Sequence, residues 1–501
     1  MKTKITSKAS LLMLALNAGA VVNSFAQTPP LVFDVENRTA TGTCNTAAGN
    51  TSTSITSLPD PFTFTTGGRV ATFNDWTCRR NQIKSDIENY EIGAKPPKPS
   101  TVTATYSSAT TTLTVVCTQN GQTLTLTSKV NMPTGAGPFP IVIGMNSPTG
   151  SAGTAPFSGV IQVPFNHDQV TTYNGKNANN PFFKLYPTLT ANGQYSAWSW
   201  GISRLIDGIE LVKDQMKADP KRIAVTGCSY AGKMALFGGA FDERIALTIA
   251  QESGGGGINS WRMSQAFTTR TGVNIEKINN TNYSWFKTSM QNLNPNTLPH
   301  DHHELVAMIA PRAFLALGNP GYEWLGDESG YKSLMAAVEV WKAMGVSDRF
   351  GFDFAGGHTH CVAASSQTTA ITSFVNRFLK NGTNTTNVRA NPSNSVFNLT
   401  INSSVFNWTT PTIPYSTVTA IDDSQIAEEA RVNCFPNPFN RELTIEVQGD
   451  FNYQLMNQVG QLVESGQAND KITLSNDYPK GVYLVKITQE NKSKVLKLVK
   501  E

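Results

Sequence analysis

The stretch Arg222–Lys233, which reads Arg-Ile-Ala-Val-Thr-Gly-Cys-Ser-Tyr-Ala-Gly-Lys, restricts the fold more than any other part of this 501-residue sequence. An apolar run, Ile223–Gly227, leads into Ser229 and small residues, and the helical pattern Ala231–Phe241 follows. Small residues around one serine let a strand turn sharply into a helix, because bulky neighbours would clash in such a turn. The stretch therefore predicts a strand–turn–helix unit that exposes the Ser229 hydroxyl.

Apolar runs and helical patterns alternate on both sides of this unit. The runs that we interpret as strands are Phe139–Met145, Ile223–Gly227, Ile245–Ala250, Ala313–Gly318 and Phe350–Ala355. The stretches that we interpret as helices are Asp75–Tyr90, Trp200–Met216, Ala231–Phe241, Val306–Ile309, Leu334–Met344 and Ile371–Leu379. Strands that alternate with helices form a mostly parallel sheet covered on both faces, so the sequence predicts an α/β three-layer sandwich.

Two other regions show the period of strands alone. Three runs before the α/β region alternate in this period, and Asn120-Gly121 between the last two predicts a hairpin. They are Thr101–Ser107, Thr112–Thr118 and Thr123–Val130. Near the C-terminus, four short strands separated by turn residues predict a small all-β sandwich. These are Leu443–Val447, Tyr453–Met456, Lys471–Leu474 and Val482–Ile487.

Composition divides the chain into parts. Residues 27–57 and 381–432 are rich in Thr, Asn, Ser or Gly and carry little helical patterning, which predicts a polar leader and a linker. Between them lies the main α/β domain, residues 58–380, and after the linker comes the β module, residues 433–501.

Residues 1–26 have the pattern of a signal peptide. Lysines precede the short apolar run Leu11–Val22, and small residues at Ser24 and Ala26 predict cleavage near Ala26. A buried helix is the alternative, but the run is too short to cross a bilayer, which needs about 20 apolar residues. We therefore expect a secreted or cell-surface protein without a membrane span, in which disulfides are allowed.

The charge balance excludes some classes of partner. The chain carries 40 Lys and Arg against 36 Asp and Glu, a net charge of +4. So small a net charge in a chain of this length gives no reason to expect nucleic acid or an anionic membrane as a partner.

Ser229 needs a base and an acid if it is a nucleophile. Hydrolases with such a turn present serine, acid and histidine in that chain order. Gly356-Gly357-His358-Thr359-His360-Cys361, directly after the last predicted strand, supplies His360 as the base. The helix that starts behind Ser229 favours the negative charge that develops in acyl transfer.

Two glutamates are candidates for the acid. Glu252 follows the strand Ile245–Ala250, and Glu323 follows the strand Ala313–Gly318. Both lie at carboxyl ends of strands, where sites form in open α/β sheets, and the acid would orient and stabilise the charged imidazole. Each glutamate could partly replace the other, and each could also be an ordinary surface charge.

The histidines allow a second interpretation. His358 and His360 could form a metal site with the segment His300-Asp301-His302-His303. A serine at a sharp turn upstream explains a late base better, so we expect no metal and no cofactor.

Two cysteines adjoin the proposed catalytic residues. Cys228 precedes Ser229 and Cys361 follows His360. If the serine hydroxyl bonds to the imidazole, the cysteines must lie close together, and a disulfide needs Cα atoms about 4.4–6.8 Å apart. We therefore predict a Cys228–Cys361 disulfide beside the site; the count of six cysteines does not fix the other pairings.

With these residues in hand, the region from about Leu58 to Leu379 resembles the glucuronoyl esterases of carbohydrate esterase family 15. The resemblance rests on ordered motifs. They include Leu58-Pro-Asp-Pro-Phe-Thr-Phe64, Trp76-x-Cys78-Arg-Arg80, Gly227-Cys-Ser-x-x-Gly-Lys233, Gln251-Glu-Ser-Gly254, Asp301-His-His303, Pro311-Arg312, Trp324-Leu-Gly326 and Gly356-Gly-His-x-His-Cys361. It implies an α/β-hydrolase fold and cleavage of 4-O-methyl-glucuronate esters that link glucuronoxylan to lignin.

The resemblance also assigns residues. It implies Ser229 as nucleophile, His360 as base, and Glu252 as acid, with Glu323 near the place where some bacterial members carry theirs. It implies that Lys233, Trp324 and Glu276 bind the sugar. It further implies the disulfides Cys44–Cys78 and Cys228–Cys361, and a structural role for Asp301-His302-His303.

The sequence departs from this family directly after the nucleophile. Members usually carry Arg there, which helps to hold the oxyanion, whereas this chain has Tyr230. A tyrosine hydroxyl can donate a hydrogen bond but carries no charge. Tyr230 is therefore the oxyanion candidate of this chain, and it leaves an esterase for another uronate or acetyl ester as an alternative.

The β module resembles the sorting domain of the type IX secretion system. The motifs are Asn433-Cys-Phe-Pro-Asn-Pro-Phe439, Gly481-Val-Tyr-Leu-Val-Lys486 and a basic C-terminus. The resemblance implies secretion machinery as a partner. A carbohydrate-binding sandwich is the alternative for the module, and a polysaccharide-binding protein on a decayed hydrolase fold is the non-enzyme alternative for the chain.

Overall fold

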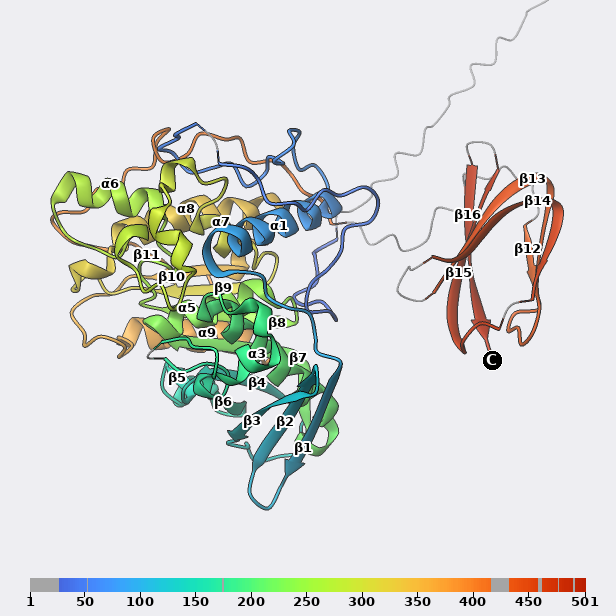
Figure 1. The fold of residues 1–501 in the computed structure, drawn as a ribbon, viewed down its shortest axis with the longest axis horizontal. Coiled ribbons are helices and arrows are strands. Elements are labelled where there is room, and N and C mark those ends of the chain that lie inside the picture. Colours follow the sequence, from blue (N-terminus) through green and yellow to red (C-terminus); the bar gives the residue numbers. More distant parts are fainter. Residues whose placement is uncertain are drawn as a thin grey trace, which may run out of the picture. The chain divides into compact units, whose positions relative to one another are not determined.

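The computed structural model describes residues 27–51, 53–173, 175–415, 432–457, 462–475, 477–489 and 492–501; the predicted signal peptide lies outside them. The chain divides into two compact units, Met1–Tyr415 and Ser416–Glu501 (Figure 1). Each unit has its own hydrophobic core.

A seven-stranded sheet runs through the first unit in the order β11-β10-β9-β8-β7-β4-β6. Every neighbouring pair in it is parallel, as expected from the alternation of strands and helices in the sequence. The strands are β4 (Phe139–Met145), β6 (Ile161–Phe165), β7 (Ala218–Cys228), β8 (Ile245–Gln251), β9 (Ala313–Leu317), β10 (Phe350–Asp353) and β11 (Arg389–Ala390). The short strand β5 (Pro148–Ser151) follows β4.

Helices cover both faces of this sheet. Successive side chains of a strand point to opposite faces, so Ile141 and Ile143 of β4 join one core cluster while Val142 joins the other. The first face packs on α3 and α5 and the second on α9 (Figure 1). The helices are α1 (Phe73–Ile87), α2 (Pro181–Leu185), α3 (Gln194–Leu211), α4 (Lys213–Met216), α5 (Tyr230–Phe241), α6 (Trp261–Thr271), α7 (His302–Ala307), α8 (Asp327–Ala343) and α9 (Ser365–Phe378). Helix α6 was not predicted from the sequence, because its apolar positions are sparse.

The predicted hairpin is part of a separate three-stranded antiparallel sheet. It consists of β1 (Thr101–Ser107), β2 (Thr112–Gln119) and β3 (Gln122–Lys129). Asn120 and Gly121 both have positive φ, 53° and 72°, as the tight turn between β2 and β3 requires.

Residues 27–57 and 381–415 are not the loose leader and linker that the sequence predicts, because much of each segment packs on the rest of the first unit. Near the N-terminus, Arg38 pairs with the fully buried Glu243 at 2.8 Å. After residue 381, β11 extends the main sheet, the Val405 carbonyl accepts the Leu58 N–H, and Ile413 is buried. Polar composition did not exclude packing here, because a few apolar residues and backbone hydrogen bonds fasten each segment.

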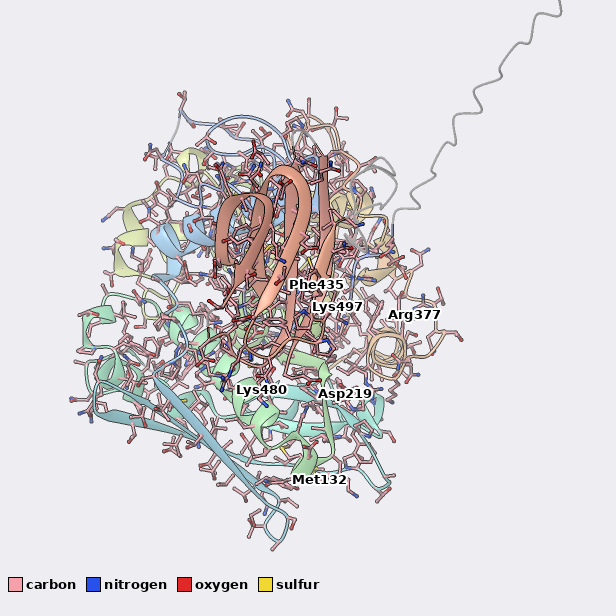
Figure 2. The ribbon with its side chains drawn as sticks, turned by 90° about the vertical axis from the view of Figure 1, so that its right-hand side faces the viewer. Met132, Asp219, Arg377, Phe435, Lys480 and Lys497 are labelled. Carbon is pink, nitrogen blue, oxygen red and sulfur yellow. A yellow bond between two sulfur atoms is a disulfide. The ribbon has the colours of Figure 1, made fainter. Side chains whose placement is uncertain are left out.

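The second unit is the predicted all-β module. Its five-stranded antiparallel sheet comprises β12 (Asn433–Phe435), β13 (Leu443–Asn457), β14 (Leu462–Leu474), β15 (Gly481–Gln489) and β16 (Lys492–Lys500). Figure 2 labels Phe435 on β12, which is 43% exposed, and Lys497 on β16. Nowhere in the described parts of the chain is a helix both long and apolar enough to span a membrane.

Candidate active site

Ser229 occupies the sharp turn between β7 and α5. Its φ of 58° lies in the left-handed region, and its N–H donates to the Gln251 carbonyl of the neighbouring strand at 3.0 Å. A Cβ on Gly227 would lie 2.3 Å from the Ala231 oxygen, and one on Gly232 would lie 2.4 Å from the Gln251 oxygen. Only glycine fits at these two positions, which explains the motif around the serine. Ser229 as a whole is half-buried.

Glu252 and His360 meet at the carboxyl edge of the sheet. The imidazole Nδ1 of His360 lies 2.6 Å from Oε2 of Glu252, which directly follows β8. The second carboxylate oxygen accepts the N–H of Cys361 at 3.0 Å. The Glu252 side chain is fully buried, and that of His360 is 29% exposed. This geometry holds the ring and leaves Nε2 for a reacting proton.

The predicted disulfide Cys228–Cys361 is present. Its Cα atoms are 5.6 Å apart, and the bond joins residues separated by 133 positions. The cysteine sulfurs and a ring nitrogen of His360 lie within 4.8 Å of one another. The bond ties the residue before Ser229 to the residue after His360, and the hydrogen bonds of His360 and Cys361 to Glu252 hold the same loop. The other pairing implied by the resemblance, Cys44–Cys78, is also present.

The two glutamates differ sharply in environment. Glu323 lies in a short 3-10 turn, Glu323–Leu325, and is exposed. The first residue with a polar side chain after β9 is instead Asn319, which is fully buried and donates to the His358 carbonyl at 3.0 Å. Sequence position alone could not separate Glu252 from Glu323, because both follow strands.

Lys233 and Glu276 form an ion pair next to the nucleophile turn. The ammonium lies 2.7 Å from Oε2 of Glu276 and 5.3 Å from the ring centroid of Trp285. The other oxygen of Glu276 accepts the Thr281 hydroxyl at 2.6 Å. These groups offer donors and acceptors suited to sugar hydroxyls.

Aromatic side chains flank His360. The ring of Trp324 lies edge-on to the imidazole at 5.0 Å between centroids, and the Trp324 side chain is 48% exposed. Tyr322 contacts the loop of His360, since its hydroxyl oxygen accepts the backbone N–H of His360 at 3.2 Å. Tyr322 was not predicted as a site residue, although it stands next to Glu323.

Tyr230 is enclosed by polar and aromatic partners. Its hydroxyl oxygen accepts the Asn146 side-chain N–H and lies 3.2 Å from Nε2 of His167. Its ring packs against Tyr173 at 4.5 Å and Trp285 at 5.9 Å between centroids. Burial raises the pKa of the phenol, so the hydroxyl keeps its proton. Asn146 and His167 were not predicted; the signal available was that Asn146 directly follows β4, the neighbour of the nucleophile strand, and His167 closely follows β6, the next strand out.

The other histidines have partners of their own. His300 and His302 each place Nε2 on the buried carboxylate of Glu91, at 2.8 and 2.7 Å. Despite the cost of burial, hydrogen bonds and the opposite charges lower the pKa of Glu91 and raise the pKa of both histidines. His303 contacts the Pro59 carbonyl at 2.8 Å. This arrangement is a buried charged cluster that joins distant segments of the chain.

Comparison with known proteins identifies relatives of both units. A family profile described as glucuronyl esterase, fungi, matches residues 115–345, and one described as secretion system C-terminal sorting domain matches residues 433–501. A 4-O-methyl-glucuronoyl methylesterase of Podospora anserina is 38% identical over 385 residues, covering 74% of this chain and 78% of the relative. One from Cerrena unicolor is 38% identical over 371 residues, covering 71% and 76%.

Solved structures match the same region. The glucuronoyl esterase catalytic domain from Hypocrea jecorina superposes with a TM-score of 0.67 at 36% identity, covering 72% of this chain and 98% of that chain. A glucuronoyl esterase variant from Sporotrichum thermophile, in complex with methyl 4-O-methyl-β-D-glucopyranuronate, gives 0.66 at 34% identity, covering 72% and 96%. These matches confirm the α/β-hydrolase class expected from the sequence.

Proposed function

The chain belongs to the glucuronoyl esterase family, and we propose that Ser229, His360 and Glu252 carry out its ester hydrolysis. Membership of this family makes the chain a carboxylic ester hydrolase that acts on glucuronate esters. The observation that carries our assignment of residues is the 2.6 Å contact between His360 and the buried Glu252, in a loop tied by a disulfide to the serine turn.

The reaction is acyl transfer through the serine. The Ser229 oxygen attacks the uronate carbonyl while His360 takes its proton, and the buried carboxylate of Glu252 stabilises the resulting imidazolium. When the tetrahedral intermediate collapses, the ester C–O bond breaks and His360 gives the proton to the leaving alcohol. Water then attacks the acyl-enzyme with the same base, which releases the uronic acid and restores the serine.

The start of α5 supplies the first oxyanion donor. The first N–H groups of a helix have no partner within the helix, and the N–H of Tyr230 comes directly after the nucleophile. Tyr230 therefore serves the oxyanion through its backbone, whatever its side chain does.

Lys233, Glu276 and Trp324 are the residues that we assign to the sugar. The ion pair presents charged donors and acceptors to ring hydroxyls, and the exposed indole of Trp324 offers an apolar face beside His360. We infer that the natural substrates are esters of 4-O-methyl-glucuronic acid in glucuronoxylan, linked to lignin alcohols. Alanine at Lys233 should raise KM for a glucuronate ester more than it lowers kcat.

A second candidate is an esterase for another uronate or an acetyl ester, favoured by Tyr230 in place of the family's Arg. The test compares a benzyl glucuronate ester with its galacturonate counterpart and an aryl acetate, in kcat/KM. We expect the glucuronate ester to exceed both by at least about tenfold; preference for either alternative would reassign the substrate.

We further propose export in two steps. The signal peptide of residues 1–26 would direct the chain out of the cytoplasm, and the sorting domain would engage type IX secretion machinery, leaving the enzyme secreted or on the cell surface. Deletion of residues 434–501 in the native host should retain the esterase inside the cell, and unchanged release would refute this role.

A further inference from the structure

We propose that the side chain of Asn146 is a second oxyanion donor, held in place by Tyr230 and His167. The proposal rests on the ester hydrolysis at Ser229 proposed above. The neutral amide of Asn146 would stabilise the oxyanion, which is the role of the Arg that members of the family usually carry at the position of Tyr230.

Asn146 lies beside the nucleophile turn. It directly follows β4, the parallel neighbour of the nucleophile strand β7, in which Gly144 is paired with Thr226. Two residues further along each chain come Asn146 and Cys228, so both lie at the carboxyl ends of neighbouring strands, which are spaced about 4.8 Å apart. The turn after β4 then folds against β7, because a Cβ on Gly150 would lie 3.1 Å from the Gly227 Cα.

The conformation of Asn146 leaves its side chain free to serve the site. Its backbone N–H already donates to the Phe165 carbonyl at 3.0 Å, so the backbone cannot supply the donor. Its φ of 63° is left-handed, a conformation that Asn tolerates better than most residues. The residue is exposed, and its amide carries two N–H groups, of which one donates to the Tyr230 hydroxyl. The second N–H is available to a substrate oxygen.

Tyr230 and His167 fix the direction of this amide. Nδ1 of the buried His167 lies 3.0 Å from the Asp168 carboxylate, which favours a proton on Nδ1 and leaves Nε2 to accept the phenol hydrogen at 3.2 Å. The phenol hydrogen therefore goes to His167 and the phenol oxygen accepts from Asn146. Tyr173 and Trp285 pack against the same ring, so the phenol cannot easily turn away. Tyr230 and His167 are positioning residues that act through Asn146.

The test separates the side chain of Asn146 from its backbone. Asn146→Gly accepts the left-handed φ without strain, so any loss of rate belongs to the missing amide. One oxyanion donor is worth about 10²–10³ in kcat, and we expect a fall in that range with KM changed by less than about threefold, because the bond forms only in the transition state. Asn120→Gly, at an exposed hairpin residue with φ 53°, is the matched control and should leave kcat unchanged.

A double-mutant cycle tests the positioning role. Tyr230→Phe removes the hydroxyl that holds the amide and should lower kcat by about tenfold or more in the wild type, but should have no further effect on Asn146→Gly. Asn146→Gly with kcat within threefold of wild type would overturn the donor, and additive effects would overturn the positioning by Tyr230. If the wild type itself fails to hydrolyse the glucuronate ester, the proposed function fails instead, so the two failures are distinguishable.

Discussion

Replacing Glu252 by Gln should remove the acid of the triad while leaving its shape. The carboxylate receives the Nδ1 hydrogen of His360 at 2.6 Å and the N–H of Cys361 at 3.0 Å, in full burial. An amide can still accept the Cys361 N–H, but it no longer stabilises an imidazolium, and its own N–H favours the wrong tautomer of His360. In serine hydrolases the carboxylate-to-amide change lowers kcat by about 10⁴, which corresponds to about 5.4 kcal/mol in activation free energy.

Glu323→Gln is the matched control. Its carboxylate is exposed in the turn before Trp324, so we expect kcat within about twofold of wild type. Initial rates on a benzyl glucuronate ester, with Tm recorded for each variant, give the comparison. The assignment of the acid is refuted if Glu252→Gln keeps more than a tenth of the wild-type kcat, or if Glu323→Gln falls as far as Glu252→Gln does.

Three further predictions follow from the packing. A chain of residues 27–415 should keep full activity and Tm, whereas 27–380, which lacks β11 and the buried residues after it, should be strongly destabilised or insoluble; equal Tm values would refute this. Glu91→Gln leaves two buried histidines without their anion, a loss of about 3–5 kcal/mol, which in a unit of this size lowers Tm by roughly 5 °C. Folding raises the pKa of both histidines, so the stabilisation from their pairing with Glu91 is fully present below the unfolded pKa and fades as pH rises. The difference in Tm between wild type and Glu91→Gln should therefore be larger at pH 6 than at pH 9. An equal difference at both pH values would contradict the pairing. Alanine at both Cys228 and Cys361 should cost about 5 kcal/mol of stability, because the bond closes a loop of 133 residues, and should also lower kcat. A non-reduced digest of the wild type should contain the two peptides linked by this bond. Finding both thiols free in that digest would refute the disulfide.

The sequence predicted the parallel sheet and the serine turn because both have strong local causes. An apolar run such as Phe139–Met145 is stable only when it is buried between helices. Gly227 and Gly232 are required because a Cβ at either position would lie less than 2.5 Å from a backbone oxygen. The Cys228–Cys361 bond could be predicted because each cysteine adjoins a residue of the site. It needed only the assumption that nucleophile and base meet.

Other features depend on contacts that composition does not reveal. The segment 381–415 is polar enough to suggest a linker, yet β11 adds to the sheet edge and a few apolar residues such as Ile413 fill gaps. The choice between Glu252 and Glu323 depended on which side chain the loop of His360 reaches. The environment of Tyr230 depended on Asn146 and His167, which come from two different strand ends and share no sequence pattern.

The rate of Ser229→Ala on a benzyl glucuronate ester tests the central claim most directly. The Ser229 turn is set by backbone contacts rather than by the hydroxyl, so the variant should fold with an unchanged Tm. Removing a triad member typically lowers kcat by several powers of ten, and we expect a fall of at least about 10³ in kcat. A folded Ser229→Ala protein that retains activity within tenfold of wild type would contradict the account.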